Sequence, residues 1–357
     1  MIEPYGVIGL SPTAWGIQKR ADISKNLDHI EELTNGALSL CALDIPVRLL
    51  VLPEGALQGF TDEVLDMPMV EFLKDGAIDI PGPETERLGQ LAQRHNLFIM
   101  AQAKVREPDW PDIMFNVGFV INPQGDIILR HHKMSALLPS ERSASPHDLF
   151  DKWVEKYGRT LQSFWPVVDT EIGRLGVMMA MEGNFPENGR GLAMNGAEVV
   201  YRASLPTPFT ENDMFEISNR ARALENNLYI VAPNIAPVYT FPHSLAPIDC
   251  GGGSSLIVDY KGKIIGKQKD TNGSSYVHAV IDIEAQRYHR THSSVTNWLK
   301  DIRTECAQLI YEKPVYPKNI YLNHAQGNHK EYKENVLSKQ IEMMIERGIY
   351  RLSVYDK

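Results

Sequence analysis

The chain has 357 residues, of which 43% are hydrophobic and 23% charged, proportions typical of a globular protein with one large core or two modest ones. Its formal net charge of −9 and its lack of a basic block argue against non-specific binding to nucleic acid. No run of about 18 apolar residues occurs, and the first residues lack the basic and apolar regions of a signal peptide. We therefore expect a cytoplasmic protein that makes no membrane contact.

The predicted elements alternate between strand and helix as far as about residue 282. Residues 6–10 form an apolar run of strand length, and residues 23–40 carry apolar side chains at three- and four-residue steps, which predicts an amphipathic helix. The further predicted elements are, in chain order, strand 47–52, helix 83–95, strand 97–103, hairpin 115–122 with 127–129, strand 175–180, helix 187–195, strand 198–201, helix 214–226, strand 229–233 and hairpin 255–259 with 264–267. This alternation predicts one α/β domain.

Three features depart from this simple alternation. On the predicted helix 214–226, residues 214, 217, 221 and 224 form one apolar stripe. Residues 142–165 have no clear period and are predicted to be a loop insertion of the kind that covers a site. From about residue 300 the chain is rich in Pro, Tyr and Asn and ends in a helix near 334–347. We divide the chain into a domain at 1–300 and a C-terminal arm at 301–357 that packs on the core or on a neighbouring subunit.

The insertion is rich in aromatic side chains, which have two interpretations. They either shape a roomier apolar pocket or pack the loop onto the core or a partner subunit, and we favour packing. The rings concerned are Phe150, Trp153, Tyr157, Phe164 and Trp165.

The three cysteines, Cys41, Cys250 and Cys306, are an odd number at wide spacings, which fits neither a disulfide framework nor a metal knuckle. We expect reduced, mostly buried thiols. His131 and His132 are adjacent, but no third ligand follows at a suitable spacing. The sequence therefore predicts no metal.

Two charged side chains stand at the ends of predicted strands. Glu54 follows the run 49–53, at the carboxyl end of a buried strand, where α/β folds place their active sites. A partly desolvated carboxylate there suits a general base, although a turn acid or a helix cap is the alternative. Lys133 closes the run 127–133, and Glu141 follows eight residues later. An ammonium near a carbonyl stabilises the oxyanion formed on attack, although a single Lys in isolation is more often a surface residue.

A third position is the strand, turn and helix around Ala180. The strand that ends at Ala180 is followed by Glu182, Asn184 and the helix-opening Pro186-Glu187. A side chain at such a turn points into the cleft, where backbone N–H groups and the helix N-terminus stabilise a developing negative charge. An enzyme would present a nucleophile here, but this residue is alanine.

Together these motifs resemble the nitrilase, or carbon–nitrogen hydrolase, superfamily. The resemblance rests on Glu54 after Leu-Pro, on Lys133 before Pro139-Ser-Glu141 and on the turn before Phe185-Pro-Glu187, and it runs from about residue 6 to 282. It implies a four-layer α-β-β-α sandwich and a Glu-Lys-Cys triad that cleaves non-peptide carbon–nitrogen bonds through an acyl-enzyme. It also implies a small-molecule amide or nitrile substrate, no cofactor and a homo-oligomer.

The resemblance assigns roles to individual residues. Glu54 is similar to the general base, Lys133 to the oxyanion lysine and Glu141 to the glutamate that positions Lys133 and substrate. Ala180 stands where the family has its cysteine, and neither Cys41 nor Cys250 matches that motif. Met181, through its N–H, and Glu182 are the expected substrate-binding residues.

The substrate class and the origin of Ala180 each have more than one interpretation. The turn motif and the spacing from Lys133 to Glu141 most resemble the aliphatic amidase and formamidase branch, so amide hydrolysis is favoured over cleavage of nitriles or N-carbamoyl compounds. A naturally silent homologue would be under no pressure to keep Glu54, Lys133 and Glu141, so we favour an engineered replacement of cysteine by Ala180. The alternative from another class is a natural, catalytically silent protein that binds an amide.

Overall fold

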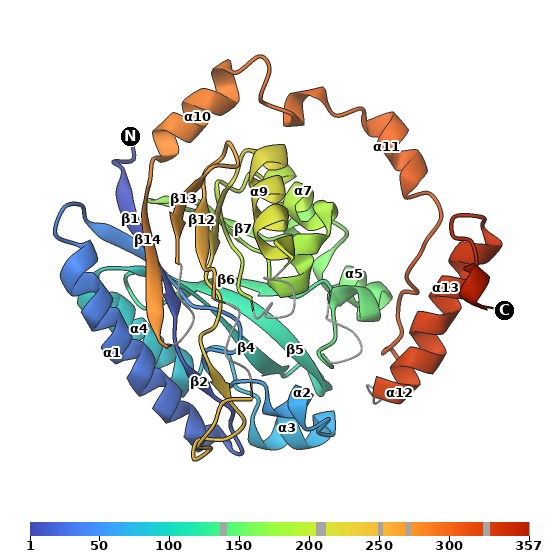
Figure 1. Cartoon of the computed structure of the whole chain (residues 1–357), viewed down its shortest axis with the longest axis horizontal. Coiled ribbons are helices and arrows are strands. Elements are labelled where there is room, and N and C mark those ends of the chain that lie inside the picture. The colour runs from blue at the N-terminus through green and yellow to red at the C-terminus, as the bar shows by residue number, and fades with distance from the viewer. Residues whose placement is uncertain (136–140, 205–211, 249–252, 269–272, 324–328, 357) are drawn as a thin grey trace.

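The computed structural model describes residues 1–135, 141–204, 212–248, 253–268, 273–323 and 329–356. Two six-stranded sheets pack face to face, with helices outside them (Figure 1). The first sheet has the order β14-β1-β3-β4-β5-β6, with the bounds Ser275–Ile281, Tyr5–Ser11, Val47–Val51, Phe98–Glu107, Trp110–Ile121 and Ile127–His132. The second has the order β13-β12-β10-β9-β8-β7, with the bounds Ile264–Lys267, Leu256–Val258, Tyr229–Ala232, Val199–Tyr201, Gly173–Val177 and Val167–Thr170. A separate pair is formed by β2 (Ala14–Trp15) and β11 (Val238–Tyr239).

Each sheet has parallel strands at its centre and antiparallel strands at its edges. β1, β3 and β4 run parallel, as do β8, β9 and β10. β5 and β6 extend the first sheet as antiparallel hairpins, and the predicted turn at 123–126 joins them. Since parallel strands present their carboxyl ends at one edge, the segments after β3 and after β8 lie where ligand sites of α/β sheets form.

Helices cover both outer faces of the sandwich. α1 (Ile23–Cys41) and α4 (Pro83–His95) lie on the first sheet, and α7 (Pro186–Met194) and α9 (Met214–Asn226) lie on the second (Figure 1). α4 has the predicted bounds because Pro83 opens it and Asn96, in the left-handed conformation, ends it. The remaining helical segments are η1 (Arg20–Asp22), α2 (Thr61–Val64), α3 (Met69–Asp75), η2 (Pro146–Leu149), α5 (Phe150–Tyr157), α6 (Leu161–Phe164), η3 (Ala180–Asn184), α10 (Ile283–His292), η4 (Leu299–Asp301), α11 (Thr304–Ile310), α12 (His329–Tyr332), η5 (Lys333–Leu337), α13 (Ser338–Glu346) and η6 (Val354–Asp356).

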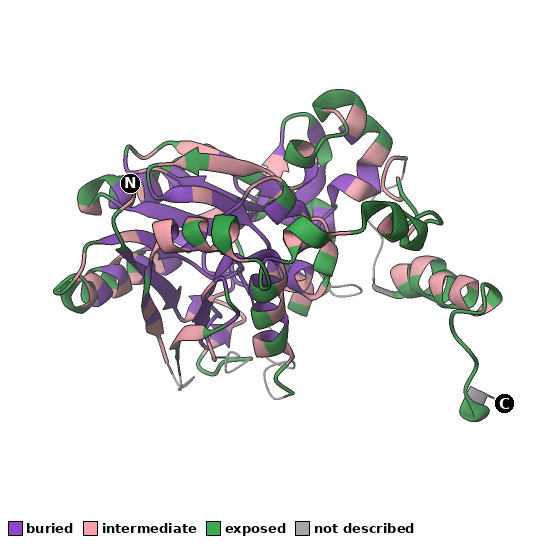
Figure 2. Cartoon of the chain, turned by 90° about the horizontal axis from the view of Figure 1, so that it is seen from above, coloured by how far each residue is buried: buried purple, intermediate pink, exposed green. Residues whose placement is uncertain are grey.

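The core between the sheets is apolar and tightly packed. Leu49 and Val51 of the first sheet belong to the same buried cluster as Leu175 and Val177 of the second. Gly118 on β5 marks a close approach of the sheets, because a Cβ there would lie 2.4 Å from Val177 Cγ1. Buried residues fill the central strands and the inner faces of the covering helices (Figure 2). The fold is therefore the expected four-layer α-β-β-α sandwich.

The apolar stripe on helix 214–226 does not face the core. Ile217 and Leu224 are 61% and 39% exposed, whereas the buried face of α9 is mixed and carries Phe215 and Ala223 beside polar residues such as Arg222. The polar residues lie there because α9 also packs over the turn that begins at Ala180, where the Arg222 Nε donates to the carbonyl of Gly183 at 3.1 Å. Periodicity locates the helix but misidentifies its buried side.

The insertion 142–165 is helical rather than irregular. It forms η2, α5 and α6, and Thr160 caps α6 by accepting from the Ser163 N–H. Trp153 lies against Trp110 and His132, with ring centroids 6.3 and 4.9 Å apart. Phe150 stacks on Phe164. The favoured interpretation, that these rings pack the segment onto the core, is confirmed for these residues.

The C-terminal segment runs as an arc around the body and ends in helices that project from it (Figures 1 and 2). Its contacts with the body include residues 318–321: Lys318 and Asn319 bind the Asp151 carboxylate at 2.6 Å, and the Tyr321 N–H donates to the Asp148 carbonyl at 3.1 Å. No residue of α13 is buried. The helices of the described residues include none with the length and apolarity that a bilayer span requires.

The cysteines only partly match expectation. Cys41 is half-buried at the end of α1, but Cys306 is exposed on α11, so the prediction of a buried thiol is wrong there. Cys250 lies outside the described residues.

Candidate active site

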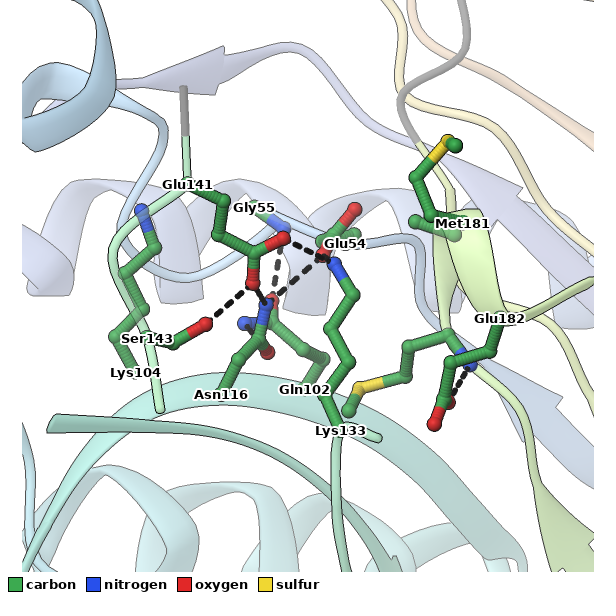
Figure 3. Close-up of polar contacts among 12 residues, drawn as sticks. Glu54, Gly55, Gln102, Lys104, Asn116, Lys133, Glu141, Ser143, Met181 and Glu182 are labelled. Carbon is green, nitrogen blue, oxygen red and sulfur yellow. Dashed lines mark hydrogen bonds and ion pairs between the residues drawn. The ribbon is translucent and has the colours of Figure 1, made fainter. Parts of the chain in front are cut away.

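Three charged side chains, from the segments that follow β3 and β6, meet in one buried cluster (Figure 3). Glu54 follows β3, Lys133 follows β6, and Glu141 comes eight residues later. The Lys133 Nζ lies 2.9 Å from Glu54 Oε1 and 2.6 Å from Glu141 Oε2. None of the three side chains is more than 8% exposed. The structure thus brings these three expected site residues together.

An amide relay beneath the cluster orients its carboxylates. The Asn116 Nδ2 on β5 donates to Glu54 Oε1 and Glu141 Oε1, both at 2.9 Å. Gln102 on β4 donates to Asn116 Oδ1 at 2.6 Å and accepts from the Gly55 N–H at 2.9 Å (Figure 3). Because Gln102 occupies the carbonyl oxygen of Asn116, the NH2 group of Asn116 must face the carboxylates.

The cluster has well-defined charges. Burial opposes the ammonium form of Lys133, but the Glu141 and Glu54 carboxylates raise the pKa of Lys133 above its usual value. Burial also opposes the ionised form of Glu141, but Lys133, with hydrogen bonds from Ser143 and Asn116, lowers the pKa of Glu141 to about 2. Both groups are therefore charged at neutral pH, and Lys133 acts as a fixed cation rather than as a proton acceptor.

The turn at Ala180 has a strained backbone. β8 ends at Val177, earlier than predicted, but the Ala180 N–H still donates to the Ala203 carbonyl at 2.6 Å. The φ angle of Ala180 is +39°, in the left-handed region, where a residue with a Cβ is disfavoured by about 1–2 kcal/mol. Such strain persists only where the surrounding contacts enforce it, and it is concentrated at functional positions.

Glu182 holds this turn in place. Its side chain is fully buried, and its carboxylate accepts from the Met179 N–H and the Met134 N–H, both at 2.6 Å, and from His131 Nε2 at 3.0 Å. It therefore connects the residue before Ala180 with the residue after Lys133. Both carboxylate oxygens of Glu182 are thus occupied by protein donors that fix the turn, and its contact with substrate stays a prediction.

Met181 lies on the opposite side of the turn. Its side chain points away from the carboxylate of Glu182 (Figure 3). Within the described residues its N–H donates to no backbone or side-chain acceptor. A free N–H at the start of a helical turn is the kind of donor that an oxyanion requires.

A second buried acid–lysine cluster lies beside Glu141. The Lys104 Nζ on β4 contacts both carboxylate oxygens of Asp62 at 2.6 Å and Glu63 Oε1 at 2.7 Å. Burial, with repulsion from the Asp62 and Glu141 carboxylates, raises the pKa of Glu63 to about 7 against the charge of Lys104. None of Lys104, Asp62 and Glu63 was expected at a site from the sequence.

Glu63 is expected to make stability depend on pH. Its folded pKa lies above its unfolded value, so folding takes up a proton between about pH 4.5 and 7, and stability falls as pH rises through that window. Glu63→Gln removes this loss, so relative to the unsubstituted chain it should gain about 1–3 kcal/mol between pH 5.5 and 8. Urea unfolding at the two pH values measures this gain. Glu305→Gln, on exposed α11, is the control, and an identical pH dependence for all three proteins would contradict the assignment.

The site residues that the sequence analysis missed are polar residues within buried strands. Gln102 and Lys104 stand in an otherwise apolar part of β4, and Asn116 does so in β5. Arg202 directly follows the buried strand β9. A polar side chain that interrupts an apolar strand must find partners inside the protein, so this interruption was an available signal.

Nothing in the described part of the chain has the donor set of a metal site, since no three His, Cys, Asp or Glu side chains are grouped suitably. His131 instead pairs with Glu182, and His132 pairs with Glu107 at 3.0 Å.

A sandwich of two mixed sheets, with a Glu-Lys-Glu cluster facing a strained strand-to-helix turn, defines the class of carbon–nitrogen hydrolases of the nitrilase type. Residues 6–290 match the carbon–nitrogen hydrolase family, and the chain belongs to that family. A formamidase of Bacillus cereus (strain AH820) is 29% identical over 222 residues, which cover 62% of this chain and 59% of the formamidase.

Two solved structures resemble the fold. Saccharomyces cerevisiae Nit3, a member of branch 10 of the nitrilase superfamily, has 21% sequence identity and a TM-score of 0.62, with coverage of 82% of this chain and 96% of Nit3. A cysteine-to-alanine variant of the Nesterenkonia AN1 amidase has 17% identity and a TM-score of 0.60, with coverage of 86% and 97%. At these identities the likeness supports the fold.

Proposed function

We propose that this fold hydrolyses a small amide to a carboxylate and ammonia or an amine when a cysteine occupies position 180, and that the chain with Ala180 is inactive. The observation that carries the proposal is the Glu54-Lys133-Glu141 cluster opposite the left-handed turn at Ala180. The formamidase relatives support an amide as the substrate. Nitriles and N-carbamoyl compounds are the alternative substrates.

The proposed first half-reaction forms a thioester. Glu54 accepts the thiol proton, and the thiolate attacks the amide carbon. Lys133 and the Met181 N–H stabilise the oxyanion. When the tetrahedral intermediate collapses, the C–N bond breaks and the nitrogen leaves with the proton held by Glu54. Both hydrogen bonds to the Glu54 carboxylate, from Lys133 and Asn116, go to Oε1, and within the described residues Oε2 accepts none, so it is the oxygen that takes the proton.

The second half-reaction releases the acid. Glu54 removes a proton from water, and the resulting hydroxide attacks the thioester carbon. The C–S bond breaks, the sulfur takes back the proton held by Glu54, and the carboxylic acid leaves and loses its proton to solvent as the carboxylate product. Glu141 takes part by holding Lys133 and by remaining ionised throughout, in keeping with its low pKa.

The test is to introduce the nucleophile. Ala180→Cys is expected to hydrolyse at least one member of a panel of small amides, nitriles and carbamoyl compounds, and to show the acyl mass increase on that cysteine. The unsubstituted chain, which retains Cys41 and Cys306, is the control for adventitious labelling. Failure of the variant to form any adduct, or turnover by the unsubstituted chain, would contradict the proposal.

The competing function is a silent amide-binding protein. It predicts an alanine codon at position 180 in the gene, and tight amide binding without turnover even after Ala180→Cys. Sequencing that codon and calorimetric titration with the same panel distinguish the two functions.

We also propose a homo-oligomer. Ile217 and Leu224 on α9 and Met194 on α7 present apolar side chains at the surface of two helices that contact each other. The arm at 301–357 is a second candidate contact because α13 buries none of its residues on this chain. Light scattering on the purified protein gives the assembly mass, and a monomer would contradict this proposal.

A further inference from the structure

Arg202 is a buried cation directly behind the turn at Ala180. It follows β9 and is only 2% exposed. Its Nε and Nη2 donate to the Ala180 carbonyl oxygen at 3.3 and 3.2 Å, and Nη2 also donates to Asn184 Oδ1 at 3.2 Å. Its Nη1 donates to Ser218 Oγ at 2.8 Å. The guanidinium therefore donates hydrogen bonds to both the first and the last residue of the short helix η3.

The partners of Arg202 are unusual for a buried charge. A buried arginine is ordinarily paired with a carboxylate, because uncompensated charge is expensive to bury. Within the described residues Arg202 forms no salt bridge, and its partners are neutral oxygens and the Phe215 ring at 5.0 Å. Burial, with repulsion from Arg222, lowers the pKa of Arg202 to about 9, while Glu54 opposes this change. The guanidinium remains charged at neutral pH.

The turn is built around this guanidinium. A Cβ on Gly183 would lie 2.2 Å from Arg202 Nε, so no larger residue fits at position 183 without moving the arginine. The carbonyl of Ala180 points toward the guanidinium, while the residue itself has the left-handed φ of +39°. Two donors on one carbonyl oxygen fix the orientation of the peptide group, and with it the direction of the residue 180 side chain.

We propose that Arg202 is a positioning residue for position 180, which fixes the strained turn through its carbonyl and supplies the positive charge that favours a thiolate there. This inference rests on the proposed function. Arg202 touches no reacting atom and acts through the backbone and the field at the turn.

Other charged groups surround position 180, and all of them contribute to the electrostatic potential there. Lys133 lies between the Glu54 and Glu141 carboxylates, and the Glu182 carboxylate accepts from His131. Arg222 on α9 is paired with Glu225, and Arg190 on α7 donates to the Glu225 carbonyl. Arg202 is thus the cation that donates directly to residue 180, and no carboxylate among the described residues forms an ion pair with it.

The experiment measures the thiol directly in the Ala180→Cys background. The pH dependence of iodoacetamide alkylation at position 180, followed by peptide mass mapping so that Cys41 and Cys306 are counted separately, gives the thiol pKa without any substrate. We expect a thiol pKa below the ordinary value of about 8.5 for cysteine. Arg202→Met should raise this pKa by about 1. Arg202→Lys should raise it by less, because lysine keeps the charge but cannot donate two hydrogen bonds to the Ala180 carbonyl as Arg202 does. Arg220→Met, on the exposed side of α9, is the matched control and should leave the thiol pKa unchanged.

The outcomes separate this inference from the proposed function. A thiol pKa in a folded Arg202→Met protein equal to that of the Arg220→Met control would overturn the inference. Far-UV circular dichroism checks the fold. If Arg202→Met does not fold, Arg202→Lys decides: a pKa raised above the control supports the inference, and an unchanged pKa overturns it. A parent with a depressed thiol pKa that hydrolyses no amide contradicts the proposed function alone.

Discussion

Lys133→Met is expected to destabilise the protein by about 3–5 kcal/mol at pH 8, because it leaves the Glu54 and Glu141 carboxylates buried without their shared cation. Both carboxylates accept from the same Asn116 NH2 group, so they stay close together after the ammonium is gone. Two like charges in one buried site cannot both remain ionised, so one of them must take up a proton. Urea unfolding measures the change.

The pH dependence identifies the mechanism of that loss. With Lys133 in place, Glu141 has a depressed pKa and contributes stability that is present above its unfolded pKa of about 4.5 and lost as pH falls toward about 2. In Lys133→Met this contribution is absent, so the difference between the two proteins should shrink below about pH 4.5. Lys300→Met is the control, since Lys300 forms a half-exposed surface pair worth about 0–1 kcal/mol. Equal stability of the two variants at pH 8 would contradict the claim that Lys133 neutralises two buried carboxylates.

Glu182→Gln is expected to destabilise the protein by about 2–4 kcal/mol, because one of two buried backbone N–H groups would then face an NH2 group instead of a carboxylate oxygen. The lost contact is either to Met179, before Ala180, or to Met134, after Lys133. The substitution should therefore loosen the turn and the cluster relative to each other. Thermal and urea unfolding measure the stability.

The same variant tests whether Glu182 positions the turn or contacts substrate. In the Ala180→Cys background a positioning residue should lower kcat together with stability, whereas a residue that only contacts substrate should raise KM and leave stability unchanged. Glu187→Gln is the matched control. Glu187 lies at the exposed start of α7 and accepts a hydrogen bond from the Tyr311 hydroxyl, and the amide oxygen of glutamine can accept the same hydrogen bond. A Glu182→Gln protein as stable as this control would support the substrate-binding assignment.

The local signals in the sequence were sufficient for most elements and for the charged site. Strand runs and capping residues located β3, α4, the hairpin of β5 with β6, and α9, since these depend on period and on end residues such as Pro83 and Asn96. The positions of Glu54 and Lys133 at strand ends were visible for the same reason. The periodicity of the sequence does not predict η2, α5 and α6. Their apolar residues are mainly aromatic, and Trp153 among them packs on one patch of β5 and β6, so these residues do not form a regular apolar stripe.

By itself the sequence determined which charged residues follow buried strands and that position 180 carries no nucleophile, because both features depend on neighbouring residues. Only the tertiary structure decided which distant groups share one environment. The Gln102–Asn116 relay, the Lys104 cluster and the Arg202 contact with the Ala180 carbonyl join residues that are far apart in the chain. Burial makes these partnerships obligatory, since a polar group inside the protein must find its partner wherever the fold places one.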